Sequence, residues 1–516
     1  MKKNKVLLTL ILLFVVGFLC RFSLSSTPFW VDEFSTVREA NLVLREGFSV
    51  FLQNTEFFEA HNITTHFLVA GSFKVFGIGE WQARLPFMII GSIVPIFIYL
   101  LAKKLTNKNT ALVSSLVYIF SYWQITWARQ ARGYVLQQLL VLITLYLYKS
   151  LLDKFSKFKL IILLFISIFG LLTHTTYILI LGSLFLHFIF FNNKTFLKII
   201  LNPLSLITSI LIVSMAFFTS QFEAITSNLK TLIIYHPNNL AYYHSFLWRE
   251  QTIITLLAFI GVLIMLFKEK KYKISSLLLL PIGSYLFFVC FMFAPYVSRY
   301  LLPIFPLLII FAGYSISKFG ELISKKNALL FSLLITFFII ANGDKFVLKP
   351  KAFYSVNHDM REIALIDYDQ VYGIIKEKGD LDKEETAVID TWPDRLKWYL
   401  GENKEYFYAF RWLKSEGLVN GLPKSTNYKL NESNEKYIPL TGLPEIKLIG
   451  ELSDLEMAMS KYPKGFIWID DSSLPADVIN YAKENFKEEL YSDHYPLDDN
   501  PYSIWPGTLY SWGFKE

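Results

Sequence analysis

Residues 79–105 read GEWQARLPFMIIGSIVPIFIYLLAKKL. Within this stretch, residues 86–102 form an apolar block of the length that crosses a bilayer as a helix, about 17–25 residues. Arg84 precedes the block, and Lys103 and Lys104 follow it. Because cytoplasmic loops of membrane proteins are enriched in lysine, this stretch predicts a transmembrane helix whose carboxyl end faces the cytoplasm.

Similar blocks recur along the whole chain of 516 residues. The composition is 53% hydrophobic and 18% charged, and the mean hydropathy is +0.39. Soluble domains carry roughly 25% charged residues. The sequence therefore predicts a polytopic α-helical membrane protein with about 11 transmembrane helices. Their expected positions are 5–22, 86–102, 110–127, 133–152, 158–173, 176–191, 199–218, 252–267, 274–294, 299–317 and 327–342.

The lysines between these blocks predict the orientation of the chain. Lysines cluster in alternate loops, all on the side of the amino terminus, which we therefore expect to be cytoplasmic. They are Lys103, Lys104 and Lys108, then Lys149, Lys154, Lys157 and Lys159, then Lys194 and Lys198, then Lys268, Lys270, Lys271 and Lys273, and finally Lys318, Lys325 and Lys326. The net charge of +7 is explained by this orientation, and no nucleic-acid partner is expected. No A-x-A cleavage site follows the first block, which we interpret as a retained helix.

The carboxyl-terminal part has a different composition and is expected outside the cytoplasm. Short apolar runs, ETAVID at 385–390 and GFIWID at 465–470, alternate with amphipathic stretches at about 357–378 and 474–484. This alternation predicts an extracytoplasmic α/β domain at 346–516. Residues 1–345, including an outer loop at 23–85, form the predicted membrane domain. The pair Asp470–Asp471 is interpreted as a turn.

Two adjacent carboxylates, Asp32 and Glu33, lie about ten residues beyond the first block. Charge near lipid is costly unless it has a partner or a function. Apolar side chains at helical spacing within residues 34–52 predict a helix in the membrane interface that holds this pair near the headgroups. An alternative interpretation is that the two acids only cap this helix.

Arginines gather on the same outer side. Arg129 and Arg132 lie in WARQARGYVL, Arg84 begins the second span, and Arg299 lies in PYVSRYLLPIFP. Guanidinium groups bind phosphate oxygens in a bidentate manner, so these arginines indicate an anionic partner. The alternatives are pairing with the acidic pair or lipid headgroups, and snorkelling to the interface.

Histidines and cysteines give weaker signals. His61 and His66 have no cysteine nearby and no tight ligand spacing, so hydrogen bonding is favoured over a zinc site. His174 is predicted at the outer turn between the fifth and sixth spans. Cys20 and Cys290 lie inside apolar blocks, where no disulfide or metal site is expected.

Together these motifs resemble a family. The motifs are the acidic pair, residues 61–77, residues 79–105, RQARGYVL at 129–136, THTTY at 173–177 and SRYLLPIFPLL at 298–308. Their order and spacing are similar to those in GT-C glycosyltransferases that use polyprenyl-phosphate sugars, in the family 39 and 83 group. This group includes protein O-mannosyltransferases and aminoarabinose transferases of lipid A. The resemblance covers about residues 1–345. The chain departs from the family pattern at Asn62, Ile63, Gln130 and Gly133.

The resemblance implies an inverting transfer of one sugar from a polyprenyl-phosphate donor to an envelope acceptor, which is a lipid, a glycan or a protein, at the outer face of the cell membrane. In this hypothesis Asp32 is the base and Glu33 orients the acceptor or an arginine. Arg132, Arg84 and Arg299 hold the donor phosphate, and His61, Tyr134, His174 and Tyr300 are further site candidates. A monophosphate donor reduces the need for a divalent metal, so no cofactor is expected to be essential, although His61 leaves a metal open.

Three other functions remain as alternatives. A transporter or flippase of lipid-linked sugars would need charges inside the bundle and often has paired repeats, and neither is visible here. A glycan ligase or polymerase that uses diphosphate-linked donors should lack the acidic pair. A structural protein with a sensor-like external domain leaves the outer arginines unexplained.

Overall fold

The computed structural model describes residues 2–22, 28–47, 62–200, 238–293, 297–342, 346, 366–381, 385–401, 404–411, 414–419, 422–425, 428–432, 434–440, 443–470, 474–492 and 506–514. The chain divides into two compact units. The first comprises Met1–Ser25 and Glu46–Pro350, and the second Ser26–Arg45 and Lys351–Glu516.

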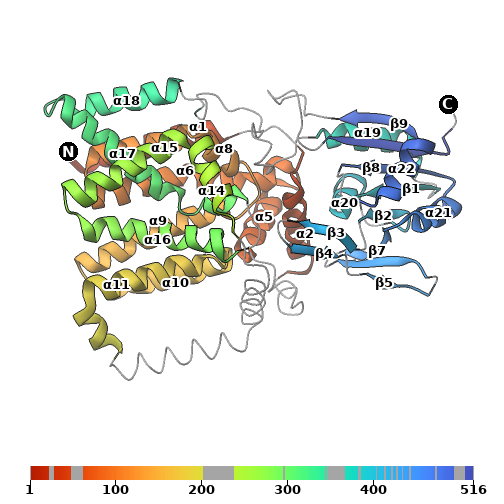
Figure 1. Ribbon diagram of the computed structural model, residues 1–516, viewed down its shortest axis with the longest axis horizontal. Helices are drawn as coiled ribbons and strands as arrows, with labels where there is room; N and C mark the ends of the chain where they lie inside the picture. The colour runs from red at the N-terminus through yellow and green to blue at the C-terminus, as the bar shows by residue number, and fades with distance from the viewer. Residues whose placement is uncertain are drawn as a thin grey trace. The chain divides into compact units, whose positions relative to one another are not determined.

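The first unit is helical (Figure 1). Its helices are α1 (Lys2–Arg21), α5 (Ile63–Phe76), α6 (Glu80–Leu105), α7 (Lys108–Phe120), α8 (Tyr122–Ala128), α9 (Tyr134–Asp153), α10 (Lys157–Thr173), α11 (Tyr177–Ile200), α14 (Leu240–Ser245), η1 (Phe246–Glu250), α15 (Thr252–Leu263), η2 (Ile264–Lys268), α16 (Tyr272–Phe291), η3 (Ser298–Leu301), α17 (Phe305–Ile323) and α18 (Ala328–Asn342).

The predicted polytopic helical architecture is confirmed, since helices occupy ten of the predicted spans. The remaining span, 199–218, lies almost wholly outside the described residues. Among the residues described, five helices are long and apolar enough to cross a membrane, and a sixth span would be the pair 240–250 and 252–268, bent by 100°. Helix α17 begins later than predicted, at Phe305, because Pro306 occupies its first turn, where a missing N–H is tolerated.

Helix α17 is largely enclosed and packs against α7, α15 and α18. Small residues allow its close approach to two of them. A Cβ atom on Gly261 of α15 would lie 2.1 Å from the carbonyl oxygen of Phe311, and one on Gly313 would lie 2.1 Å from Oγ of Ser114 on α7. Close packing of this kind stabilises helices in a bilayer, where lipid offers no hydrophobic drive for association.

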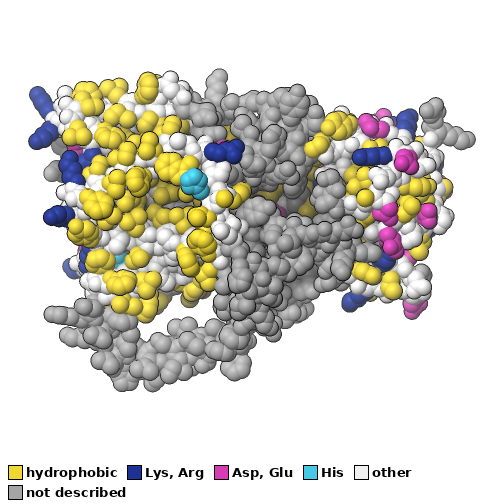
Figure 2. Space-filling view, viewed as in Figure 1, with side chains coloured by type: hydrophobic (Ala, Val, Ile, Leu, Met, Phe, Trp, Pro, Cys, Tyr) yellow, Lys and Arg dark blue, Asp and Glu magenta, His cyan; other side chains and the backbone are white. Residues whose placement is uncertain are grey.

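The lysines of the predicted cytoplasmic loops gather at one end of this unit, where α1 begins (Figures 1 and 2). Ion pairs join neighbouring loops there. Lys104 pairs with Asp153 at 3.0 Å, and Lys318 pairs with Glu269 at 2.9 Å. Helices α9 and α17 end at this face, so their first residues lie at the opposite end, about 30 Å away for a helix of 20 residues.

The second unit contains the predicted α/β region. Its eight-stranded sheet has the order β5-β6-β7-β2-β1-β8-β10-β9, in which β7, β2, β1 and β8 are parallel. The strands are β1 (Thr386–Asp390), β2 (Phe407–Phe410), β5 (Lys429–Leu430), β6 (Lys436–Leu440), β7 (Leu443–Ile449), β8 (Lys464–Ile469), β9 (Lys487–Ser492) and β10 (Gly507–Trp512), and β3 (Lys414–Val419) pairs with β4 (Leu422–Ser425) separately.

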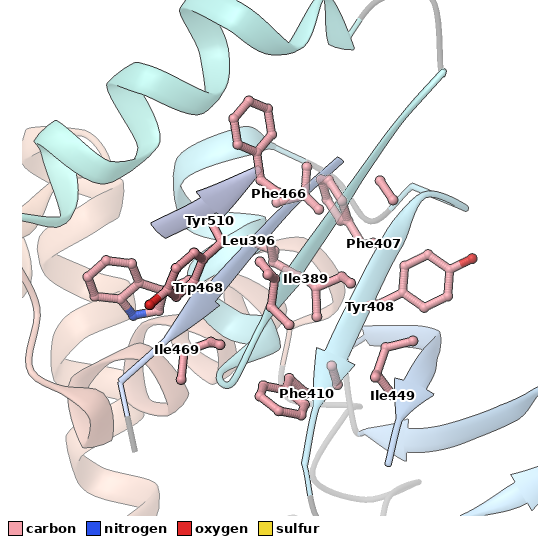
Figure 3. Packing of buried hydrophobic residues seen from close by; sticks show 14 of the residues in the cluster. Ile389, Leu396, Phe407, Tyr408, Phe410, Ile449, Phe466, Trp468, Ile469 and Tyr510 are labelled. Carbon is pink, nitrogen blue, oxygen red and sulfur yellow. The ribbon is translucent and has the colours of Figure 1, made fainter. Parts of the chain in front are cut away.

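Helices cover both faces of this sheet. They are α19 (Tyr368–Gly379), α20 (Pro393–Leu400), α21 (Leu452–Lys461) and α22 (Ala476–Asn485). The chain passes from β1 to β2 in one direction and from β7 to β8 in the other, so right-handed crossovers place α20 and α21 on opposite faces. Ile389, Phe407, Phe466 and Trp468 lie in the resulting core (Figure 3).

A buried ion network lies where β1 and β8 end. Arg395 of α20 is fully buried and donates hydrogen bonds to Asp390 and, at 2.8 Å, to Asp470. Asp470 also accepts from Thr391 at 2.8 Å and from the Trp468 indole at 3.1 Å. The turn predicted at Asp470–Asp471 lies partly outside the described residues, and the Asp470 carboxylate joins two neighbouring strands.

The segment Ser26–Arg45 packs with the α/β region, whereas the predicted membrane domain included the whole loop 23–85. It contains α2 (Val31–Glu46). The apolar side chain of Phe34 was expected to face the membrane interface. Its ring instead lies edge-on to Tyr368 and Tyr399 of the second unit, at centroid distances of 6.4 and 6.2 Å, because these aromatic rings offer an apolar surface.

The ion pairs of Glu269 make a pH-dependent contribution to stability. Burial raises the pKa of Glu269, but hydrogen bonds from Lys271 and other donors outweigh burial and lower this pKa from 4.5 to about 2. The contribution is therefore complete above about pH 4.5 and is lost as the pH falls towards about 2. Glu269→Gln should lower the unfolding temperature of the purified protein at pH 7, and the difference from wild type should shrink as the pH falls from about 4.5 to about 2.

Glu377→Gln is the matched control, because Glu377 is an exposed carboxylate on α19. This variant should unfold with the wild type at every pH. A difference between Glu269→Gln and wild type that stays constant from pH 7 to pH 2 would contradict the assignment.

Candidate active site

The acidic pair opens α2, and its two carboxylates have different surroundings. Glu33 is fully buried, and its Oε2 accepts a hydrogen bond from the backbone N–H of Trp30 at 3.0 Å. This bond is one half of a capping box, so Glu33 fixes the start of the helix. Asp32 is half-buried, and its backbone carbonyl accepts from the hydroxyl of Ser35 at 2.9 Å.

Four of the predicted residues lie together in the first unit. Tyr134 begins α9, His174 follows α10, and Arg299 and Tyr300 lie in η3. Arg299 Nε donates to the Tyr134 hydroxyl at 3.2 Å. The ring of Tyr134 lies 6.0 Å from His174 and 6.4 Å from Tyr300, measured between centroids. We call these four residues the aromatic–arginine cluster.

The cluster lies at the end of the bundle away from the lysines. Tyr134 is the first residue of α9, which ends near Lys154, and η3 precedes α17, which ends near Lys325. His174 follows α10, which begins at Lys157. The direction of these helices thus brings side chains from three separate segments to one end of the helical bundle.

Hydrogen bonds fix the ring of His174. The backbone N–H of Thr176 donates to His174 Nδ1 at 3.2 Å, and the Thr176 hydroxyl lies 2.7 Å from the same nitrogen. Because Nδ1 accepts, the proton of the neutral ring is carried by Nε2. Gln137 donates to Thr176 Oγ1 at 3.1 Å and to the Tyr285 hydroxyl at 2.9 Å, which ties this turn to α16.

Arg84 lies near two further arginines. Arg21 is fully buried and donates to the carbonyls of Tyr118 and Ile119 at the end of α7, each at 3.3 Å. Arg129 donates to the carbonyl of Arg21 at 3.0 Å. Burial lowers the pKa of Arg129 to about 10, with smaller contributions from the charges of Arg21 and Arg84. Arg21 and Arg129 thus cap helix ends, where cations interact favourably with the carbonyl dipoles.

Arg132 is half-buried in the turn between α8 and α9. The next residue, Gly133, is one of the departures from the family pattern, and a Cβ atom there would lie 2.6 Å from Oγ1 of Thr65 and 2.9 Å from Oδ1 of Asn62. Asn62, a second departure, has a φ of 106°, which a proline ring cannot adopt. The two departures are therefore neighbours at the place where the start of α5 meets this turn. The close contact explains the glycine, and the positive φ explains why residue 62 is not proline.

The histidines of the outer loop have no described metal site. His61 lies outside the described residues, and His66 is buried in α5. Within the part of the chain that the structure describes, no group of three or more His, Cys, Asp and Glu side chains is arranged to hold a metal ion.

Two buried glutamines, which were not among the predicted residues, support the aromatic–arginine cluster. Gln138, fully buried, accepts from the Tyr118 hydroxyl at 2.8 Å and donates to the Leu302 carbonyl at 2.7 Å. Gln137 holds the His174 turn as described above. The available signal was the Gln137–Gln138 pair inside an apolar span, where polar residues are costly and usually have a role.

Comparisons with known proteins agree with this architecture. Residues 60–219 match the family model described as dolichyl-phosphate-mannose-protein mannosyltransferase. An uncharacterized protein of Aquifex aeolicus (strain VF5) is 30% identical over 138 residues, which are 26% of this chain and 28% of that protein. The chain therefore spans less than a third of the length of this curated relative.

Solved structures share the fold. The apo oligosaccharyltransferase of Archaeoglobus fulgidus matches with a TM-score of 0.51 and 12% identity, over 78% of this chain and 64% of that chain. The same archaeal enzyme, AglB, in complex with an inhibitory peptide and a dolichol-phosphate, matches with a TM-score of 0.50 and 10% identity, over 78% of this chain and 64% of that chain. ArnT from Cupriavidus metallidurans bound to undecaprenyl phosphate matches with a TM-score of 0.49 and 11% identity, over 99% of this chain and 98% of that chain. The two matches to the archaeal enzyme show that the chain shares the GT-C fold of multi-pass membrane proteins, as the resemblance implied.

Gln138→Leu should destabilise the site. The substitution leaves the Tyr118 hydroxyl and the Leu302 carbonyl without this partner, at a cost of about 1–3 kcal/mol for each buried group. We expect a lower unfolding temperature and faster hydrogen exchange in residues 298–304. Gln370→Leu, at an exposed position on α19, is the control and should leave both unchanged. Unaltered exchange in Gln138→Leu would show that this bond does not hold the segment.

Proposed function

We propose that this protein is a membrane glycosyltransferase that moves one sugar from a polyprenyl-phosphate donor to an acceptor of the cell envelope. The reaction takes place at the bilayer face opposite the lysine-rich loops, which is the extracytoplasmic face of the cell membrane. The observation that carries this proposal is the convergence of Tyr134, His174, Arg299 and Tyr300 at that face.

The comparisons support the same proposal. The description of the matched family model names a sugar linked to dolichyl phosphate. The structure of an archaeal oligosaccharyltransferase of this fold was solved with a dolichol-phosphate bound. A lipid-linked phosphate presents an anionic group at the headgroup level of the bilayer. An arginine held against a tyrosine hydroxyl at the end of a membrane bundle is suited to bind such a group.

Asp32 is the proposed base. It removes the proton from an acceptor hydroxyl while the acceptor oxygen bonds to the anomeric carbon of the sugar, which inverts that centre. Glu33 accepts from Trp30 N–H, and this bond holds the first turn of α2 in place. Of the two acids, Asp32 therefore has the chemical role and Glu33 the supporting one.

Arginines stabilise the leaving group. The bond between the anomeric carbon and the phosphate oxygen breaks, and its electron pair stays on the polyprenyl phosphate, whose charge grows in the transition state. Arg299, with Arg132 and Arg84, compensates this charge. His174, with the proton of its neutral ring on Nε2, is a further hydrogen-bond donor of the cluster. A monophosphate leaving group stabilised by guanidinium groups needs no essential metal in this scheme.

Cells that lack this protein should lose one sugar from an envelope lipid, glycan or protein, which mass spectrometry of the envelope would detect. Wild-type protein should restore the sugar, and Asp32→Asn should not, because an amide cannot accept the proton. Glu377→Gln, an exposed carboxylate-to-amide change, is the control and should restore it. An unchanged set of envelope glycans would contradict the function, and restoration by Asp32→Asn would contradict the base.

Arg299→Gln should lower transfer from the polyprenyl-phosphate donor about 100-fold, because stabilisation of the developing phosphate charge is lost. Tyr134→Phe should have a smaller effect, about tenfold or less, because it removes one hydrogen bond to the guanidinium. Initial rates measured with purified protein check both values. Arg249→Gln, at an exposed arginine of the same unit, should be silent. Full activity of Arg299→Gln would exclude this residue from phosphate binding.

A further inference from the structure

Helix α2, which carries Asp32, is tied to the α/β region by a largely buried ion pair. Arg38 donates from one nitrogen to both carboxylate oxygens of Asp394, at 3.0 and 3.2 Å. The side chains are only 13% and 8% exposed. An ion pair so shielded from water is screened little by salt and tolerates the loss of either partner poorly.

Aromatic contacts fix the first turn of the same helix. The ring of Phe29 lies 4.9 Å from that of Trp398 on α20, measured between centroids. The ring of Phe34 lies 6.4 Å from that of Tyr368 on α19. Both phenylalanines are 1% exposed. Because Phe29 and Phe34 flank Asp32 in sequence, these contacts and the ion pair hold the turn of α2 that carries Asp32.

The ion pair lies near the carboxyl end of β1 in the parallel sheet. Strands β2 and β8 lie on either side of β1 and are reached by crossovers in opposite directions, so the carboxyl ends of β1 and β8 form a topological switch point. Parallel sheets commonly bind their ligands in the crevice at such a point. Asp394 lies four residues beyond the end of β1, in the first turn of α20.

Arg38 adds a positive charge to this edge and also lies 3.4 Å from Glu39 of its own helix. Burial lowers the pKa of Arg411, which follows β2, and the charges of Asp394 and Arg38 act on it in opposite directions. Arg38 therefore lies within electrostatic reach of the strand ends. The three aspartates at the edge are Asp390, Asp394 and Asp470, and the three arginines are Arg38, Arg395 and Arg411.

We propose that the α/β region acts as a docking platform for α2, that α2 occupies the switch point of its sheet, and that Arg38 and Asp394 are positioning residues for Asp32. The catalytic part of this inference rests on the proposed function. The docking part does not, because it concerns only contacts within the second unit.

Hydrogen exchange of the full-length protein tests docking without a substrate. Arg38→Glu and Asp394→Lys should each speed exchange of residues 31–46 at least about tenfold, since each replaces the Arg38–Asp394 attraction with two like charges side by side in a largely buried place. The exchanged pair, Arg38→Asp with Asp394→Arg, should slow this exchange again. Lys376→Glu, a charge reversal at an exposed position of α19, is the control and should match wild type. Unchanged exchange of residues 31–46 in both single variants would overturn docking.

Transfer kinetics test positioning. Because Arg299, Arg132 and Arg84 belong to the other unit, the single variants should keep the KM for the polyprenyl-phosphate sugar within about twofold and lower kcat about 100-fold, as expected when a catalytic group is misplaced. The exchanged pair should regain most of kcat. If exchange rises but kcat is unchanged, the positioning role is wrong. If the wild type transfers no sugar, the proposed function fails, while the exchange experiment still decides docking.

Discussion

Every other feature of the first unit depends on one constraint, the need to satisfy backbone hydrogen bonds across a layer without water. Helices meet this need internally, and their apolar length matches the bilayer. Lysines in alternate loops then gather at one end, where Glu269 and Asp153 pair with them. Once that end is fixed, the direction of each helix is fixed, and residues that begin α9 and α17 or end α10 must meet at the opposite face.

The polar side chains of the aromatic–arginine cluster lie at that opposite end of the bundle. Arg299 rests against the Tyr134 hydroxyl, and His174 is oriented by Thr176. Gln137 and Gln138, inside an apolar helix, connect these groups to α16, α7 and the segment before α17. The site therefore has a supporting layer of buried hydrogen bonds, which limits the freedom of its side chains.

The acidic pair belongs to a different structural unit from the arginines. Helix α2 packs on α19 and α20, and its Arg38 reaches the edge of the parallel sheet. Buried ions such as Arg395 with Asp390 and Asp470 add little net stability compared with apolar packing, but they demand one geometry. The α/β region that packs against α2 is therefore held in one arrangement by these buried ions.

The sequence by itself determined the spans, the gathering of the lysines at one end and the presence of an α/β region, because apolar length, loop charge and strand-like alternation are local properties. It also indicated Tyr134, His174, Arg299 and Tyr300 one at a time. Only the tertiary structure decided that these four meet, that Arg21 and Arg129 cap helix ends, that Glu33 bonds to the Trp30 backbone, and that α2 packs on the α/β region. These outcomes depend on pairs far apart in sequence, such as Arg38 with Asp394, whose separation of 356 residues no local pattern can bridge.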